Sequence, residues 1–401
     1  MMKKAWHRIL ALLLCMVWLG LLAVPGSAAP VAVNEEQAPG VPELGIAEGS
    51  LNLGCKSAIL MEATTGTVLY TQNANEALPP ASVTKIMTLL LVMEALDAGV
   101  VRLDSIVTVS ANAASMGGSQ VYLKEGEQMP LEDLLKSVVI ASANDAAVAL
   151  AEYIAGSVPT FVEQMNRRAV ALGMTDTVFE NVTGLDDTAE RHLTSARDIA
   201  LMSRALIAHK TVLQYSSIWM DTIRGGAFGL TNTNRLVRFY PGCTGLKTGS
   251  TSKAGFCVSV TAERDGLSLI CVIMGAESRD ERNAIATRLL DWGFAGFGLY
   301  HADGGAYEPI VAIGGKESVC PLSYGTFSCV LPKASVSGVT ARAVLPEYVA
   351  APIHAGDRVG ELEYYSGETR IGSVPIVAEQ ELLRIDFFSI LVRMIAGFLF
   401  L

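Results

Sequence analysis

A serine and a lysine stand three residues apart in the segment Ser82-Val83-Thr84-Lys85, at the predicted start of a helix. Side chains at positions i and i+3 of a helix lie on the same face, so the hydroxyl and the amine can reach each other. A serine hydroxyl is a poor nucleophile until a base takes its proton, and lysine serves as that base when burial or a second cation lowers its pKa. The helix N-terminus adds N–H groups that stabilise an oxyanion. The segment therefore indicates acyl transfer through Ser82.

Two further motifs share this order in the chain, although each motif is weak alone. Ser-x-x-Lys recurs at Ser250–Lys253, and Ser-x-Asn occurs at Ser110–Asn112 and at Ser142–Asn144. The second Ser-x-Asn lies between two predicted helices, where a loop can reach a cleft, whereas the first is predicted to be a surface turn. Lys247-Thr248-Gly249 precedes a strand, and Gly249 would let a substrate approach the backbone closely. The ordered set is far more specific than any one member.

Hydrophobic periodicity predicts the elements that must position these motifs. They are a hairpin over 57–70 with its turn at 64–66, helices over 82–98, 131–139, 145–155 and 194–207, and strands over 256–262 and 267–275 that meet at Arg264-Asp265-Gly266. From about residue 303 to 378, short apolar runs alternate with Gly, Pro and Asp, which is typical of a small all-β domain.

Composition limits the possible classes of protein. The chain has 401 residues, 51% hydrophobic and 17% charged, with a formal charge of −10. That length suggests two or three domains, and the apolar fraction excludes a mainly disordered chain. The acidic balance argues against nucleic acid as a partner. No Cys-His cluster has metal-binding spacing, so neither a metal nor another cofactor is expected.

The first 29 residues have the pattern of a secretory signal peptide: a basic start, an apolar run from Ile9 to Val24, and small residues up to Ala29. The alternative is an uncleaved N-terminal anchor, since the run is slightly long for a signal. Residues 30–50 are rich in Pro and Glu and are predicted to be a linker. We therefore expect an exported protein.

The last 20 residues, 382–401, are predicted to form an amphipathic helix. Asp386, Ser389, Arg393 and Gly397 fall on one stripe, and the rest of the surface is Phe, Ile, Leu and Met. Arg393 leaves too few residues behind it for a span, so a helix lying in the membrane surface is favoured. The alternative is a terminal helix docked on the protein's own core.

Six cysteines follow the signal peptide, too few for a disulfide scaffold. Cys257 and Cys271 lie in apolar runs and are interpreted as buried residues. Cys320 and Cys329 flank a turn-rich loop, and their pairing is left open.

The three motifs are those of penicillin-binding proteins and class A β-lactamases. PPASVTKIMT, SANDAAVALAEYIAGS, NVTGLDD, TSARDIALMSRAL and GCTGLKTGSTSKAGF resemble the exported D-alanyl-D-alanine carboxypeptidases, the low-molecular-mass penicillin-binding proteins. The resemblance covers roughly residues 50–300 and extends more weakly beyond. It implies an α+β transpeptidase-like catalytic domain over 51–300, with an antiparallel sheet and helices, then a small β-sandwich over 303–378 and the membrane-anchoring helix.

The resemblance also implies an activity: removal of the terminal D-Ala from the pentapeptide stem of peptidoglycan, with β-lactams as covalent inhibitors. Ser82 would be the nucleophile and Lys85 the general base. Ser142 would relay a proton, and Asn144 would orient the substrate amide. Lys247, Thr248, Gly249 and Ser250 would bind the substrate, with the Ser82 and Ser250 N–H groups forming the oxyanion hole. Many family members have His where this chain has Ser250.

Other readings remain open. A β-lactamase shares the motifs, and Glu190 mimics part of its deacylating loop, but Thr194 stands where that loop has Asn. An inactive cell-surface binding module is the third reading. A Ser-His-Asp hydrolase is not favoured, because this sequence has no Gly-x-Ser-x-Gly elbow. The histidines at 192, 209, 301 and 354 are interpreted as surface or packing residues. The sequence does not decide between monomeric and cross-linked wall substrates, between growth, division and sporulation, or the oligomeric state.

Overall fold

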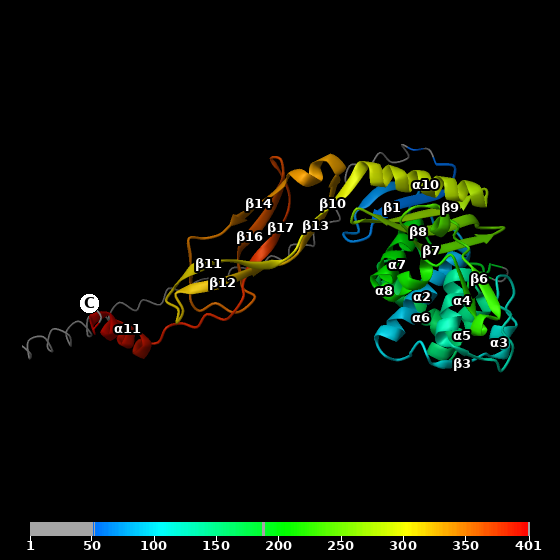
Figure 1. The fold of residues 1–401 in the computed structure, drawn as a ribbon, viewed down its shortest axis with the longest axis horizontal. Coiled ribbons are helices and arrows are strands. Elements are labelled where there is room, and N and C mark those ends of the chain that lie inside the picture. The colour runs from blue at the N-terminus through cyan, green and yellow to red at the C-terminus, as the bar shows by residue number, and fades with distance from the viewer. Residues whose placement is uncertain (1–50, 52, 187–188, 400–401) are drawn as a thin grey trace, which may run out of the picture. The chain divides into compact units, whose positions relative to one another are not determined.

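The computed structural model describes residues 51, 53–186 and 189–399. The predicted signal peptide and linker lie outside them. Figure 1 shows an α+β domain that contains the three motifs and a β-rich domain that follows it in the chain.

The α+β domain is built on one antiparallel five-stranded sheet in the order β2-β1-β9-β8-β7. Its strands are β1 (Ser57–Glu62), β2 (Val68–Gln72), β7 (Cys243–Thr251), β8 (Gly255–Arg264) and β9 (Leu267–Ala276). The predicted 57–70 hairpin is confirmed as β1 and β2, and the predicted pair of strands is confirmed as β8 and β9. Because β7 is an edge strand, its outer side is available to the site.

Successive residues of the central strands face two different cores, as period-2 alternation requires. Ala58, Leu60 and Cys271 pack with α10 (Arg279–Gly296) on one face, whereas Ile59 and Val272 face the helical layer on the other. The sheet is thus covered on both faces (Figure 1). The sequence analysis did not predict α10, although its buried Ile285, Leu289 and Leu290 recur at helical spacing.

Helices form the layer on the other face of the sheet. They are α2 (Lys85–Asp97), α3 (Ala111–Ala114), α4 (Leu131–Ala141), α5 (Asn144–Ala155), α6 (Val158–Ala171), α7 (Ala196–Ala208), α8 (Lys210–Ser216) and α9 (Leu236–Phe239), together with the short helix η1 (Ala81–Thr84). Two hairpins flank them: β3 (Ile106–Thr108) with β4 (Gln128–Pro130), and β5 (Met220–Ile223) with β6 (Phe228–Thr231) around the turn η2 (Arg224–Gly226).

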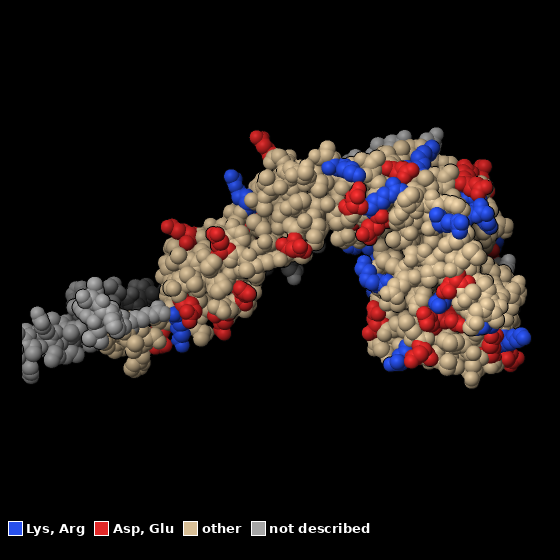
Figure 2. Space-filling view, in the orientation of Figure 1, with Lys and Arg blue, Asp and Glu red and all other residues tan. Residues whose placement is uncertain are grey.

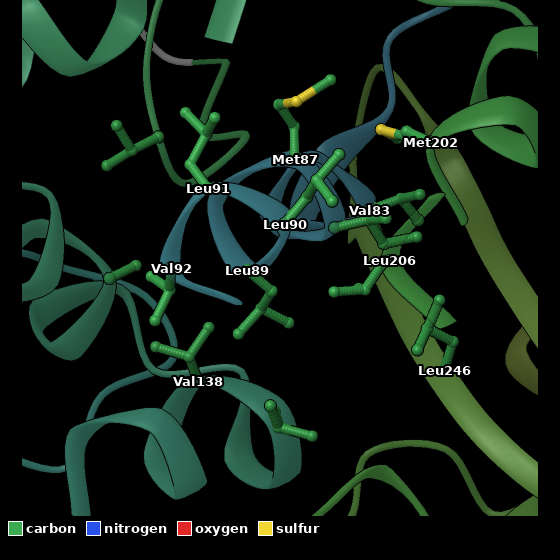
Figure 3. Close-up of a cluster of buried hydrophobic side chains, with 14 of the residues drawn as sticks. Val83, Met87, Leu89, Leu90, Leu91, Val92, Val138, Met202, Leu206 and Leu246 are labelled. Atoms are coloured by element: carbon green, nitrogen blue, oxygen red, sulfur yellow. The ribbon is translucent and has the colours of Figure 1, made fainter. Parts of the chain in front are cut away.

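Helix α2 runs through the centre of this layer and is buried from Lys85 to Met93. Figure 3 shows its side chains meeting Val138 of α4, Met202 and Leu206 of α7, and Leu246 of β7. A helix that is apolar all round belongs in a core, which explains why it shows no polar face. The first residue of this rigid element is Lys85.

The β-rich domain has a six-stranded sheet in the order β14-β16-β17-β12-β11-β15, with a two-stranded ribbon of β10 and β13. The strands are β10 (Phe297–Ala302), β11 (Gly305–Ile313), β12 (Val319–Tyr324), β13 (Phe327–Pro332), β14 (Val339–Val344), β15 (Tyr348–Ala350), β16 (Arg358–Ser366) and β17 (Thr369–Ala378), and the turn η3 (Lys333–Gly338) follows β13. Its core includes Leu322, Tyr364 and Ile376.

The C-terminal helix α11 spans Phe387–Leu399, so the predicted start at residue 382 is wrong. Leu382 is fully buried in the β-rich domain and bridges to Ile353, which holds the chain extended. Asp386 then accepts hydrogen bonds from the N–H and hydroxyl of Ser389, as an N-cap residue does. None of the described helices is long and apolar enough to cross a bilayer.

All six described cysteines are free thiols. The pairing left open for Cys320 and Cys329 is therefore not formed. Cys320 is on β12 and pairs with Ile310, whereas Cys329 is on β13 and pairs with Tyr300, so the two residues belong to different sheets.

Candidate active site

The structure brings the three motifs together at the edge of the sheet. Ser82 lies in η1 and Lys85 opens α2, while Ser142 ends α4 and Asn144 opens α5. Lys247 to Ser250 lie on β7. All five of the residues expected to be catalytic are therefore held at the ends of helices or in a strand, where little backbone freedom remains.

Lys85 is fully buried and its amine has three oxygen neighbours. Lys85 Nζ lies 2.9 Å from Ser82 Oγ, 2.6 Å from Asn144 Oδ1 and 3.0 Å from the Thr183 carbonyl. Asn144 Nδ2 donates to the Gly117 carbonyl at 2.7 Å, so the amide oxygen must face Lys85. Neither that oxygen nor a carbonyl can donate. In a neutral amine they take both N–H bonds, and the lone pair faces the Ser82 hydroxyl.

The surroundings of Lys85 disfavour its charged form. Burial, followed by the charge of Lys247, lowers the pKa of Lys85 well below that of a free lysine, while Asp145 acts in the opposite direction. Asp145 is fully buried and accepts backbone N–H bonds from Val121, Leu123 and Ala146. These bonds satisfy the buried carboxylate oxygens.

The second lysine joins the second motif to the third. Lys247 Nζ donates to Ser142 Oγ at 2.8 Å and to the Thr248 carbonyl at 2.8 Å. Burial and the nearby Arg282 lower the pKa of Lys247 to about 7. Ser142 has a left-handed backbone, with φ of 63°, which turns the chain between α4 and α5 toward β7. The Lys247 amine, whose pKa is lowered, is therefore in hydrogen-bond contact with the Ser142 hydroxyl.

Gly249 packs closely against the backbone of the turn that carries Ser82. A Cβ on Gly249 would lie 2.7 Å from the backbone N of Ser82 and 2.8 Å from that of Val83. The glycine is thus required for β7 to pack against the turn that carries Ser82; it also lines the cavity described below, and its expected role in the approach of a substrate stays a prediction. The same contact places Ser250, the next residue on β7, beside the Ser82 backbone.

A cavity of about 600 Å³ opens over these residues. Ser82, Ser142, Thr248 and Ser250 line it together with Arg235, Arg279 and Arg282. Trp219 and Phe239 complete one wall, edge to face at 6.2 Å. Three guanidinium groups and hydroxyls give the cavity the chemistry of an anion site.

Sequence reasoning missed several of these groups. The Thr183 carbonyl on Lys85 comes from the NVTGLDD segment, which was noted only for its resemblance to the family. Arg282 is 2% exposed and lies on the unpredicted α10, and Thr233 Oγ1 accepts from Thr248 Oγ1 at 2.8 Å. A buried arginine leaves no mark in a hydrophobicity pattern, so only the tertiary structure identifies it.

Ser110 of the duplicate Ser-x-Asn motif and Lys253 of the duplicate Ser-x-x-Lys motif do not line this cavity, although Ser250 does. Ser110 caps α3 by accepting from the Ala113 N–H, and it donates to Glu152. Ser110 therefore begins a short helix, where a surface turn was expected. Lys253 is exposed and donates to the Asp186 carbonyl at 2.8 Å. Glu190 is exposed, and it lines a separate small hollow with Glu180 and Arg191.

Comparison with known proteins gives a consistent picture. The family model for D-alanyl-D-alanine carboxypeptidase matches residues 45–278, and the model for the penicillin-binding protein 5 C-terminal domain matches residues 301–384. The chain is 38% identical to the D-alanyl-D-alanine carboxypeptidase DacF of Bacillus subtilis, with 84% of this chain and 88% of that protein covered. It is 36% identical to DacD of Escherichia coli, with 83% and 88% covered.

Solved structures agree with the sequence relatives. Penicillin-binding protein 5 of Haemophilus influenzae superposes with a TM-score of 0.74 at 29% identity, covering 83% of this chain and 98% of that one. Penicillin-binding protein 6B of Escherichia coli gives 0.67 at 34% identity, covering 86% and 99%. The expected α+β penicillin-binding fold with a C-terminal β domain is confirmed, and the chain belongs to the serine-type D-alanyl-D-alanine carboxypeptidase family.

Proposed function

We propose that this protein removes the terminal D-Ala from the pentapeptide stem of peptidoglycan through an acyl-enzyme on Ser82. The observation that carries the proposal is the buried amine of Lys85, whose N–H bonds are taken by Asn144 and Thr183. Its lone pair is thereby directed at the Ser82 hydroxyl, 2.9 Å away. A positioned base of lowered pKa is what a serine nucleophile requires.

In the acylation step, Lys85 takes the hydroxyl proton while Ser82 Oγ attacks the carbonyl carbon between the two D-Ala residues. The N–H groups of Ser82 and Ser250 hold the resulting oxyanion, and the packing of Gly249 against the Ser82 backbone supports this pairing. The C–N bond then breaks, and the leaving amine takes a proton through Ser142. Water later hydrolyses the ester.

Substrate recognition follows from the cationic cavity. Thr248 and Lys247 would bind the terminal carboxylate, with Arg282 and Arg235 adding positive charge in the same cavity. In the absence of substrate, both polar atoms of the Asn144 side chain are engaged, by Lys85 and by Gly117. For Asn144 to orient the substrate amide, the substrate must therefore replace one of these bonds. The absence of a nucleic-acid partner stays a prediction; Figure 2 shows acidic and basic side chains interspersed on the face it displays.

The test is release of D-Ala from a diacetyl-Lys-D-Ala-D-Ala peptide, paired with the time course of the penicillin adduct by mass spectrometry. A carboxypeptidase releases D-Ala and keeps a lasting adduct on Ser82. Fast loss of the adduct without D-Ala release would indicate a β-lactamase, and the absence of both would indicate a binding module.

We also propose that the mature enzyme is exported and attached to the outer face of the cytoplasmic membrane by α11. Phe387, Phe388, Val392 and Met394 are each more than half exposed on this helix. Burying such a side chain contributes ~1.5–3 kcal/mol, so several together would hold the protein at a bilayer. Truncation after Asp386 keeps the buried Leu382 and should release the protein from membranes with unchanged D-Ala release. Continued sedimentation with membranes would instead point to an uncleaved N-terminal anchor.

A further inference from the structure

His192 is a buried histidine outside the three motifs, and both of its ring nitrogens are engaged. It is 5% exposed, and the Phe179 ring packs edge to face against it at 5.8 Å. Nδ1 lies 3.0 Å from the Glu180 backbone N, and Nε2 lies 2.7 Å from Thr84 Oγ1. Thr84 immediately precedes Lys85, so this histidine reaches the turn of the nucleophile and the base.

The neighbours of His192 and Thr84 determine the direction of each hydrogen bond that these two side chains make. A backbone N–H can only donate, so Nδ1 accepts from Glu180, and a neutral imidazole then carries its proton on Nε2. Thr84 Oγ1 donates to the Ala81 carbonyl at 2.8 Å, because a carbonyl can only accept. Thr84 Oγ1 must therefore accept from Nε2–H. The hydrogen bonds therefore run from the Glu180 N–H to His192, from His192 to Thr84 and from Thr84 to the Ala81 carbonyl, and each proton has one acceptor.

The last acceptor in this series of hydrogen bonds is the carbonyl of Ala81, the residue that precedes Ser82. Ala81 has a φ of 49°, in the left-handed region that residues other than glycine avoid. The Ala81 carbonyl is also enclosed by Gly184, where a Cβ would lie 1.8 Å from that oxygen. The same segment supplies the Thr183 carbonyl to Lys85 and the Val182 carbonyl to Thr88. Nucleophile and base are thus held from one side by residues 182–184 and by His192.

We propose that His192, as the Nε2–H tautomer, is a positioning residue that fixes the Ala81–Thr84 turn through Thr84 and so sets the distance between Ser82 and Lys85. The inference rests on the proposed role of Ser82 as the acylated residue. It replaces the interpretation of His192 as a mere packing residue.

The imidazole has no room for a second proton. Burial lowers the pKa of His192 to about 4, against the raising effects of Glu180 and Asp186, the charged groups that face it. An imidazolium would also direct Nδ1–H at the Glu180 N–H. The neutral tautomer is therefore the working form throughout the range in which Lys85 can act as a base.

Replacing His192 by Gln or by Asn distinguishes a positioning role of this residue from a packing role. In His192→Gln the side-chain amide nitrogen can occupy the place of Nε2 and keep the bond to Thr84. In His192→Asn the side-chain oxygen can occupy the place of Nδ1 and keep only the bond from Glu180. Each variant loses one hydrogen bond, so both should lower the melting temperature by a similar amount.

The acylation step should distinguish them. With penicillin at saturating concentrations, His192→Asn should lower the rate constant for adduct formation on Ser82 by roughly 10–100-fold, because a displacement of about 1 Å can cost about 10²-fold. The dissociation constant should change little, and His192→Gln should retain most of the wild-type rate constant. Equal losses in the Gln and Asn variants would overturn the proposal.

A second pair keeps the test decisive if the His192 variants fail to fold. Thr84→Val removes the hydroxyl with little change of shape and should match His192→Asn, whereas Thr84→Ser should acylate at close to the wild-type rate. Acylation of Thr84→Val at the wild-type rate would overturn this inference alone. A wild-type chain that forms no adduct on Ser82 would overturn the proposed function and this inference with it.

Discussion

Residues 82–85 and 250–253 share the pattern Ser-x-x-Lys, and they have opposite surroundings. Lys85 is fully buried among three oxygen atoms at the start of a core helix, whereas Lys253 is exposed beyond the end of β7 and contacts a backbone carbonyl. Ser82 lies in a turn held by β7, and Ser250 is an exposed residue of that strand. The spacing is the same in both motifs, but at Lys85 burial, followed by the charge of Lys247, lowers the pKa of the amine.

The largest expected effect comes from the two serines. Ser82→Ala should abolish both D-Ala release and penicillin labelling, because it removes the only hydroxyl placed on the Lys85 lone pair, and the melting temperature should change little. Ser250→Ala keeps the backbone N–H of residue 250 and should keep labelling. A labelled Ser82→Ala variant, measured by intact mass, would mean that the wrong motif was chosen.

Replacing Lys85 and replacing Lys253 should have effects on kcat that differ almost as much as those of the two serine variants. Lys85→Arg cannot give up its proton and should lower kcat by more than about 10³-fold, whereas Lys253→Arg should stay near the wild-type value.

The pH profile gives a second measure of Lys85. Because its pKa is lowered and the neutral form is the base, kcat/KM should be high above that pKa and fall as the pH decreases through it. The midpoint should lie well below the ionisation of a free lysine. A profile without an acid limb would remove Lys85 from the base role.

The duplicated Ser-x-Asn motif offers a smaller contrast. Ser142→Ala removes the hydroxyl that Lys247 binds and should lower kcat by roughly 10²-fold, as expected for one proton-transfer group. Ser110→Ala should leave kcat unchanged and cost about 1 kcal/mol of stability through the lost N-cap. Steady-state kinetics and urea unfolding of the two variants would measure both effects, and a slow Ser110→Ala enzyme would contradict the assignment.

The smallest effect is on stability. The pKa of Lys247 is about 7 when folded and near 10.5 when unfolded, so between these values the unfolded chain binds more protons. The free energy of unfolding should therefore rise with pH, by about 1.4 kcal/mol per unit for each such lysine. Urea unfolding at pH 7 and 8.5 should show a weaker rise in Lys247→Met than in Lys253→Met. An equal rise in both variants would mean that the pKa of Lys247 is not lowered in the folded protein.

The sequence predicted most of what depends on local pattern. The hairpin over 57–70, the central helix that starts near Ser82 and the strands after Phe256 all follow from period and turn chemistry. The choice between the duplicate motifs followed from their neighbours: Ser142 lies between two helices, and Lys247 precedes a long apolar strand.

What could not be predicted depends on contacts between distant segments. Thr183 reaches Lys85 across 98 residues and His192 reaches Thr84 across 108, and both contacts arise from tertiary packing. The helix start at Phe387 was misplaced because Leu382 is apolar in either setting, and only its bridge to Ile353 shows that it belongs to the β-rich domain.

The six unpaired thiols have a consequence for the route by which the protein reaches its site of action. Burial is the largest cause of the raised pKa in all six, which brings those of Cys55, Cys243, Cys257 and Cys329 to about 11. Thiolate is the form that oxidants attack, so the folded enzyme would tolerate an oxidising exterior without any cross-link. An exported chain is exposed to that hazard only while it is unfolded. Rapid collapse after translocation would then protect its sulfur chemistry, and slow-folding variants should accumulate wrongly paired cysteines before they lose activity.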